Sequence, residues 1–168
     1  TAILILLALG SGFQAGNAID SAIKAGFLRI HFPAAIIVLL LTALRVIWWW
    51  FLDRKPGPVR GSPLWQEQLA RGVHIALYIV ILGMIASGIG MIVLSGAGPI
   101  IFGETGTALP NFHLHPPHVP HGLGAKLLLA LLFAHIEAAL YHQFIRRDGI
   151  FRRMGYGRRG SCVSPSRK

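Results

Sequence analysis

Histidines are the residues of this sequence with the greatest capacity for chemistry, and half of the eight lie inside strongly apolar runs. These four are His31, His74, His135 and His142. A fifth, His121, stands at the outer mouth of the last apolar run. Ionisable side chains are costly inside a membrane span and usually serve a function there. The single cysteine, Cys162, permits no disulfide, thiolate cluster or Cys-x-x-Cys-His haem attachment within the chain. A metal or haem would therefore depend on histidine.

The spacing of three of these histidines places them on one helix face. His135 follows His121 by fourteen residues, which on an α-helix is about 1400° of rotation and about 21 Å of rise. This rotation lies within about 40° of a whole number of turns, so the two rings share a face at two depths. His142 follows seven residues later, on nearly the same face and about 10 Å deeper.

The composition indicates that membrane-spanning helices position these side chains. Hydrophobic residues make up 54% of the chain, charged residues 13%, and the mean hydropathy is +0.60. Residues 27–52, 69–94 and 121–145 are each long enough to span a bilayer as a helix. The opening stretch "TAILILLALGSG" is too short, and we interpret it as the second half of a helix. We therefore predict an all-α membrane protein, a four-transmembrane-helix bundle whose first helix is truncated.

The sequence also predicts two loops, the position of a proline within a helix and a segment of small residues. Residues 13–26 and 95–120 are expected as loops, and the second is too rich in Gly and Pro for a helix. Pro33 falls in an early turn of the second apolar run, where proline is tolerated. The segment "GMIASGIG" in the third run carries small residues at four-residue spacing. Such residues favour close helix packing or leave room for a flat cofactor.

Basic residues predict the orientation of the chain. Loop 53–72 holds four Lys or Arg and the tail from residue 143 holds eight, whereas loop 13–26 holds one and loop 95–120 none. The positive-inside rule then places both termini in the cytoplasm. We divide the chain into a transmembrane domain, residues 1–154, and a basic cytoplasmic tail, residues 155–168. Because the basic residues cluster at the ends of apolar runs, we expect the lipid bilayer as partner and no nucleic acid.

This orientation sorts the histidines into an outer pair, His31 and His121, and an inner group, His74, His135 and His142. Two neutral imidazoles from facing helices are what bis-histidine ligation of haem iron requires, and two haems stacked across the bilayer would form an electron path. Arg29 and Arg45 are candidates for pairing with haem propionates. The alternatives remain open: the histidines could hydrogen-bond across helices, and Arg29 and Lys126 could extend to the membrane surface.

The outer loop ends in "HLHPPHVPH", which adds His113, His115 and His118 before His121. Its histidine density is typical of a surface metal site. The alternative is a proline-stiffened loop that delivers His121 to a haem. If replacing all three histidines by alanine left haem and activity unchanged, the metal hypothesis would fail.

Three stretches resemble the bacterial dihaem cytochrome b561 family over essentially the whole chain: "RIHFPAAIIVLLLTALRVIWW", "RGVHIALY" and "AHIEAALYHQFIRRDGIFRRM". The resemblance implies two b-type haems. It assigns the outer haem to His31 and His121, and the inner haem to His135 and a first-span histidine that would precede Thr1. His74 or His142 could substitute for that ligand. Both match positions near the cytoplasmic quinone region, which implies a proton or quinone role, with structural hydrogen bonding as the alternative.

The resemblance also implies a function: electron transfer in the bacterial inner membrane, as part of the respiratory chain, between a periplasmic donor and ubiquinone. Some family members oxidise superoxide at the outer haem, so a superoxide:quinone oxidoreductase activity is included. One alternative is a haem-bearing membrane-anchor subunit of a dehydrogenase or hydrogenase. Another is a histidine-lined transporter without haem. The electron donor, the direction of transfer and the oligomeric state are not encoded in a recognisable pattern.

Overall fold

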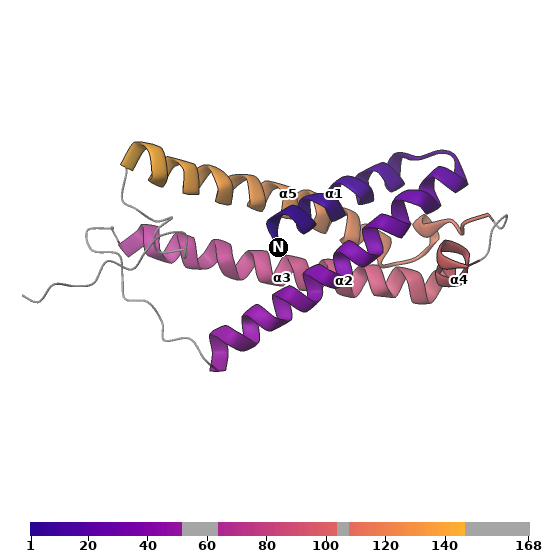
Figure 1. Cartoon of the computed structure of the whole chain (residues 1–168), viewed down its shortest axis with the longest axis horizontal. Helices are drawn as coiled ribbons and strands as arrows, with labels where there is room; N and C mark the ends of the chain where they lie inside the picture. The colour runs from indigo at the N-terminus through magenta and orange to yellow at the C-terminus, as the bar shows by residue number, and fades with distance from the viewer. Residues whose placement is uncertain (52–63, 104–107, 147–168) are drawn as a thin grey trace, which may run out of the picture. The chain divides into compact units, whose positions relative to one another are not determined.

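The computed structural model describes residues 1–51, 64–103 and 108–146. Within these ranges the elements are helical and no strand is present, which confirms the predicted all-α class (Figure 1). The elements are α1 (Ala2–Asn17), α2 (Ser21–Phe51), α3 (Leu64–Ser95), α4 (Ala97–Phe102), the 3-10 helix η1 (Phe112–Leu114), α5 (His118–Leu140) and the π-helix η2 (Tyr141–Arg146).

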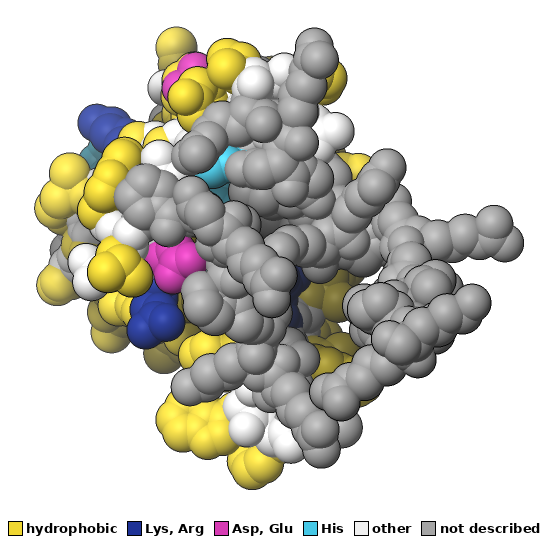
Figure 2. Space-filling view, turned by 90° about the vertical axis from the view of Figure 1, so that its left-hand side faces the viewer, with side chains coloured by type: hydrophobic (Ala, Val, Ile, Leu, Met, Phe, Trp, Pro, Cys, Tyr) yellow, Lys and Arg dark blue, Asp and Glu magenta, His cyan; other side chains and the backbone are white. Residues whose placement is uncertain are grey.

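Three segments of the described chain are long and apolar enough to cross a membrane. They are Ser21–Phe51, Leu64–Ser95 and His118–Ile145, and α1 is a shorter apolar helix. Large hydrophobic side chains project outward from all of them; Leu40, Ile79 and Leu123, for example, are each more than 60% exposed. Hydrophobic side chains make up most of the coloured surface in Figure 2. Apolar surface on this scale requires lipid rather than water around the helices.

Helices α1 and α2 form an antiparallel hairpin, visible in Figure 1 as the two indigo and violet ribbons that run back along each other. We expected a loop over residues 13–26, but α1 continues to Asn17 and α2 begins at Ser21. The Asp20 carboxylate accepts a hydrogen bond of 2.9 Å from the backbone N–H of Ile23. It satisfies a donor that the first turn of α2 would otherwise leave unpaired, so a three-residue turn is sufficient.

The hairpin interface is built from residues four apart on each helix. Ile5 and Leu9 are buried on α1, and Ala34, Val38 and Thr42 are buried on α2. Residues at this spacing lie on one face of a helix. The small Ala34, 3% exposed, leaves room for the larger side chains of α1. Close approach of the two helices therefore depends on a small side chain at that position.

The early start of α2 also corrects our placement of Pro33. The helix begins twelve residues before this proline, so Pro33 lies in its interior rather than in an early turn. Proline has no backbone N–H, and the carbonyl of Arg29, four residues earlier, therefore lacks its usual helical donor. Membrane helices accommodate such positions through neighbouring groups.

Our expectation of no helix between residues 95 and 120 was wrong at two places. Gly96 adopts a left-handed conformation, with φ of 65°, and α4 starts directly after it. Pro99 occupies the first turn of α4, where a missing N–H has no cost, and Ala97 and Ile101 are fully buried. Further along, the Asn111 side chain accepts the backbone N–H of His113 and starts η1. Glycine and proline here terminate and initiate short helices rather than exclude them.

The chain divides into two compact units, Thr1–Leu131 and Leu132–Lys168, and the boundary falls within α5. The basic residues of loop 53–72 that support our orientation lie mostly outside the described residues, as does the tail from residue 147 onward. The orientation and the division into residues 1–154 and 155–168 therefore stay predictions.

Replacing Ala34 by leucine should destabilise the α1–α2 hairpin. Extra methyl groups at a site 3% exposed force neighbouring side chains apart, at a typical cost of about 1–3 kcal/mol in free energy of unfolding. Unfolding in detergent, followed by circular dichroism, would measure the change. The matched control is Ala22→Leu at an exposed position of the same helix, with an expected change below about 0.5 kcal/mol. Equal losses in both variants would contradict the proposed interface.

Candidate functional site

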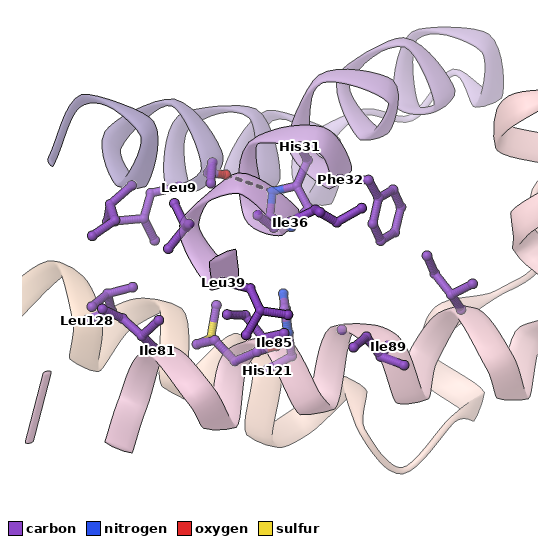
Figure 3. A pocket seen from close by; sticks show the side chains of 17 residues that line it. Leu9, His31, Phe32, Ile36, Leu39, Ile81, Ile85, Ile89, His121 and Leu128 are labelled. Carbon is purple, nitrogen blue, oxygen red and sulfur yellow. Dashed lines mark hydrogen bonds between the residues drawn. The ribbon is translucent and has the colours of Figure 1, made fainter. Parts of the chain in front are cut away.

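Two of the predicted ligands, His31 on α2 and His121 on α5, come together in the first unit. Their ring centroids are 6.1 Å apart, and the ring planes are inclined at 75°. Both rings line the same cavity, as Figure 3 shows. Both side chains are half-buried. The structure therefore places the expected outer pair at one site.

The ring of His31 is oriented by helix α1. Its Nδ1 lies 2.8 Å from the backbone carbonyl oxygen of Ala8 (Figure 3, dashed line). A carbonyl oxygen can only accept a hydrogen bond, so Nδ1 must carry the proton and donate it. In the neutral ring, Nε2 then holds the free lone pair. Helix α1 thus selects the tautomer of a histidine on α2.

The ring of His121 is oriented in the same way by α3. Its Nδ1 lies 3.0 Å from the Met84 carbonyl oxygen and 3.0 Å from the Ser87 hydroxyl. The Ser87 hydroxyl donates to the carbonyls of Gly83 and Met84, so its oxygen is free to accept. Nδ1 of His121 therefore also carries the proton, and its Nε2 also holds a lone pair. In the neutral form of each histidine, Nε2 is therefore the nitrogen that could bind a metal.

Glycines make room for both imidazole rings. A Cβ atom added at Gly12 would lie 3.0 Å from Cε1 and Nδ1 of His31. One added at Gly88 would lie 3.3 Å from Cε1 of His121. By contrast, a Cβ at Gly10 or Gly83, on the same two helices, would meet nothing within 4 Å. Of these four glycines, Gly12 and Gly88 are thus the two at which a side chain would crowd an imidazole ring.

The cavity has an apolar part and a more polar part. Both are lined by Ala8, Leu9, His31, Phe32, Met84, Gly88, Ile92 and His121. The apolar part has a volume of about 170 Å³ and is walled by aliphatic side chains of α1, α2, α3 and α5, among them Leu9, Leu39, Ile81, Ile85 and Leu128. The polar part, about 330 Å³, is lined additionally by Asn17, Lys24, Asn111, His113, His118 and Lys126. The site is therefore amphiphilic, with its two cationic amines confined to the polar part.

The donor set decides which kind of metal fits. In the part of the chain that the structure describes, no three His, Cys, Asp or Glu side chains are grouped as a metal site. Two imidazoles alone would leave zinc two ligands short of its usual four. A haem iron brings four equatorial nitrogens with it and needs only two axial ligands. His31 and His121, with an apolar wall beside them, fit that requirement.

Arg29 joins two helices in this structure. Its Nε donates a 2.6 Å hydrogen bond to the carbonyl of Ile101, the penultimate residue of α4. Phe32 packs against Phe102 beside it, with ring centroids 5.9 Å apart. A cation at this carbonyl satisfies an orphan acceptor at a helix C-terminus. Arg29 lines neither part of the cavity, and in this structure it attaches α4 to α2.

The remaining predicted residues are not among those that line this cavity. Arg45 is exposed on α2, and His74 is exposed on α3. His135 on α5 and His142 on η2 belong to the second unit, and the His142 ring contacts Tyr141 at 5.8 Å between centroids. None of the four lines either part of the cavity. Their roles stay predictions.

Sequence reasoning missed several residues that the site depends on. These are Gly12, Lys24, Ser87 as a partner of His121, and Gly88, together with the carbonyls of Ala8 and Met84. The segment "GMIASGIG" indicated either close packing or cofactor space, and Gly88 within it leaves room for the His121 ring. Carbonyl partners carry no residue signature, so only coordinates could identify them.

Comparison with known proteins gives consistent results. The family model described as "Prokaryotic cytochrome b561" matches residues 1–157. The Escherichia coli (strain K12) protein "Cytochrome b561 homolog 1" is 30% identical over 136 residues, which cover 74% of this chain and 72% of that protein. No solved structure matches the chain.

Replacing Arg29 by glutamine should allow α4 to separate from α2 more often. The charge-assisted hydrogen bond to Ile101 is of a kind that contributes roughly 1.5 kcal/mol, so the population of the open form of α4 should rise by roughly tenfold. In a Cys162→Ser background, an Ile101→Cys thiol reports this opening through its rate of maleimide labelling, because Ile101 is fully buried. Arg45→Gln on the same helix is the control and should leave the rate unchanged. Equal rates in the two variants would contradict the role of Arg29.

Proposed function

The chain belongs to the prokaryotic cytochrome b561 family, and on this premise we propose that His31 and His121 are the two axial ligands of a haem b. The family is one of membrane b-type haem proteins that transfer electrons. The observation that carries the proposal is the matched pair of hydrogen bonds from Nδ1 to backbone carbonyls. These bonds leave both Nε2 lone pairs available in one cavity.

The residues of the chain perform three tasks at this site. The carbonyls of Ala8 and Met84 hold the two imidazoles in the tautomer that ligates metal, and they raise the basicity of the ligating nitrogens. Phe32 and the aliphatic wall exclude water, which favours a stable low-dielectric site. His31 and His121 would hold the haem, which would supply one-electron transfer when bound.

The amphiphilic cavity supports one orientation of the bound haem. The macrocycle is apolar and suits the part of the cavity between Leu9, Leu39 and Ile81. Its propionates are anionic and suit the polar part, where Lys24 and Lys126 supply the positive charge. We thus propose these two lysines for propionate contacts, and the expected contact of Arg29 stays a prediction.

The second haem of the family pattern is proposed at His135, on the part of α5 that belongs to the second unit. Its opposite ligand stays a prediction from the family pattern, with His142 in the same unit as one candidate. His74 and His142 are otherwise proposed for quinone or proton contacts, and Arg45 for a propionate contact. These assignments rest on the resemblance to the family.

We propose that the protein passes single electrons between a periplasmic donor, with superoxide as one candidate, and ubiquinone. The bias of basic residues toward loop 53–72 and the tail supports a location in the inner membrane with both termini in the cytoplasm. In this orientation the His31–His121 pair lies toward the periplasmic side, and the donor would act there.

Replacing either His31 or His121 by leucine should remove one haem per chain. A pyridine haemochrome assay on the purified protein counts haem b, and the reduced-minus-oxidised spectrum checks its environment. His115→Leu is the matched control, because His115 belongs to the same loop as His113 and lies outside the cavity lining. Circular dichroism would verify that helix content is unchanged. The proposal would be wrong if either ligand variant kept the haem content of the unmodified protein.

The glycines beside the rings provide a finer test. In Gly12→Ala and Gly88→Ala, the free energy of haem dissociation, measured by haem loss on heating, should fall by about 1–3 kcal/mol, because a Cβ at either position crowds its imidazole. The effect at Gly12 should be the larger, given 3.0 Å against 3.3 Å. Gly10→Ala and Gly83→Ala, on the same helices with open space, should be neutral or stabilising by up to about 1 kcal/mol. Four equal effects would show that the crowding of the rings is irrelevant.

A further inference from the structure

Two histidines outside the proposed haem ligands form a pair at the polar part of the cavity. His113 on η1 and His118 at the start of α5 have ring centroids 4.1 Å apart, with the planes inclined at 49°. Both line the polar part of the cavity, and His115, between them in sequence, does not. The proposed function uses neither member of the pair.

The backbone holds both members of the pair in place. The N–H of His113 donates to the Asn111 side chain at 3.0 Å. The N–H of His118 donates to the carbonyl of His115 at 3.0 Å, and that of His115 donates to the carbonyl of Phe112 at 3.1 Å. Pro116 and Pro117 restrict the segment between them. The two imidazoles are therefore brought together by the fold itself, and a ligand would not need to order the loop.

From this arrangement we infer that His113 and His118 form a binding site for a divalent transition-metal ion, with Cu²⁺ as the preferred ion. Two imidazoles that bind one ion through metal–nitrogen bonds of about 2.0–2.1 Å have ring centroids about 4.5–6 Å apart. The His113 and His118 centroids are 4.1 Å apart, so a small rotation of the two side chains brings the rings into that range. Imidazole is a ligand suited to copper, zinc and nickel, and the Irving–Williams order places Cu²⁺ first among the divalent ions.

The chemistry of the surroundings limits the strength of this site. Among the described residues no third His, Cys, Asp or Glu joins the pair, so water must complete the coordination. Lys24 lines the same part of the cavity and repels a cation. The ion would therefore bind reversibly, as an open two-histidine site, and not as a permanent structural metal. This inference is independent of the haem proposal, because it uses different residues and a different metal.

The test is Cu²⁺ binding to the purified full chain, without a polyhistidine tag, followed by electron paramagnetic resonance and a binding titration. One Cu²⁺ per chain with two coordinated imidazole nitrogens is expected. His113→Ala and His118→Ala should each weaken the first binding event by more than about tenfold, since even outer-shell partners of metal sites contribute that much, and each should remove one nitrogen signal. His115→Ala should leave both affinity and spectrum unchanged.

Three results would overturn the inference: no saturable Cu²⁺ binding, equal binding by the His113→Ala/His118→Ala double variant, or an equal loss in His115→Ala. Conservative His113→Asn and His118→Asn variants, with circular dichroism of each, separate loss of a ligand from loss of the loop structure. Haem content in the same samples keeps the two proposals distinct. Unchanged haem with lost Cu²⁺ binding supports a separate site, whereas loss of both in the same single variant counts against it.

Discussion

The site depends on one constraint: the Nδ1–H of each imidazole must donate a hydrogen bond to a backbone carbonyl of another helix. His31 does so on α1 and His121 on α3. Both imidazoles are half-buried beside an apolar wall, and the carbonyl fixes both the tautomer and the ring orientation. Because a carbonyl can accept two hydrogen bonds, Ala8 and Met84 can serve the imidazoles and still belong to their helices.

This constraint determines which helices must pack closely and where. Helix α1 must approach α2 near His31, and the buried Ala34, Val38 and Thr42 provide that contact. Gly12 and Gly88 then admit the rings at distances that a Cβ would obstruct. Arg29 joins α4 to α2 two residues from His31, so this part of α2 is held from a second direction. Small residues and a cation thereby support the two histidines.

Much of this could be predicted from the sequence, because hydrophobic length and histidine position are local signals. The helical class and the meeting of His31 with His121 followed from apolar runs and depth alone. The roles of Arg29 and Gly12 could not be predicted, since they depend on which helix lies opposite. The α4 helix was missed because Gly96 and Pro99 signal a break, whereas here they begin a helix whose stability comes from the burial of Ala97 and Ile101. Tertiary contacts outweighed local propensity at that point.

The central claim is that Nε2 of His31 and Nε2 of His121 hold one haem iron while both Nδ1 atoms stay bound to carbonyls. The most direct measurement is a crystal structure of the haem-loaded protein, with anomalous scattering used to locate iron. The account predicts an iron peak between these two Nε2 atoms, with the hydrogen bonds to Ala8 and Met84 retained. An iron atom bound elsewhere with none between these rings, or ligation through Nδ1, would contradict it.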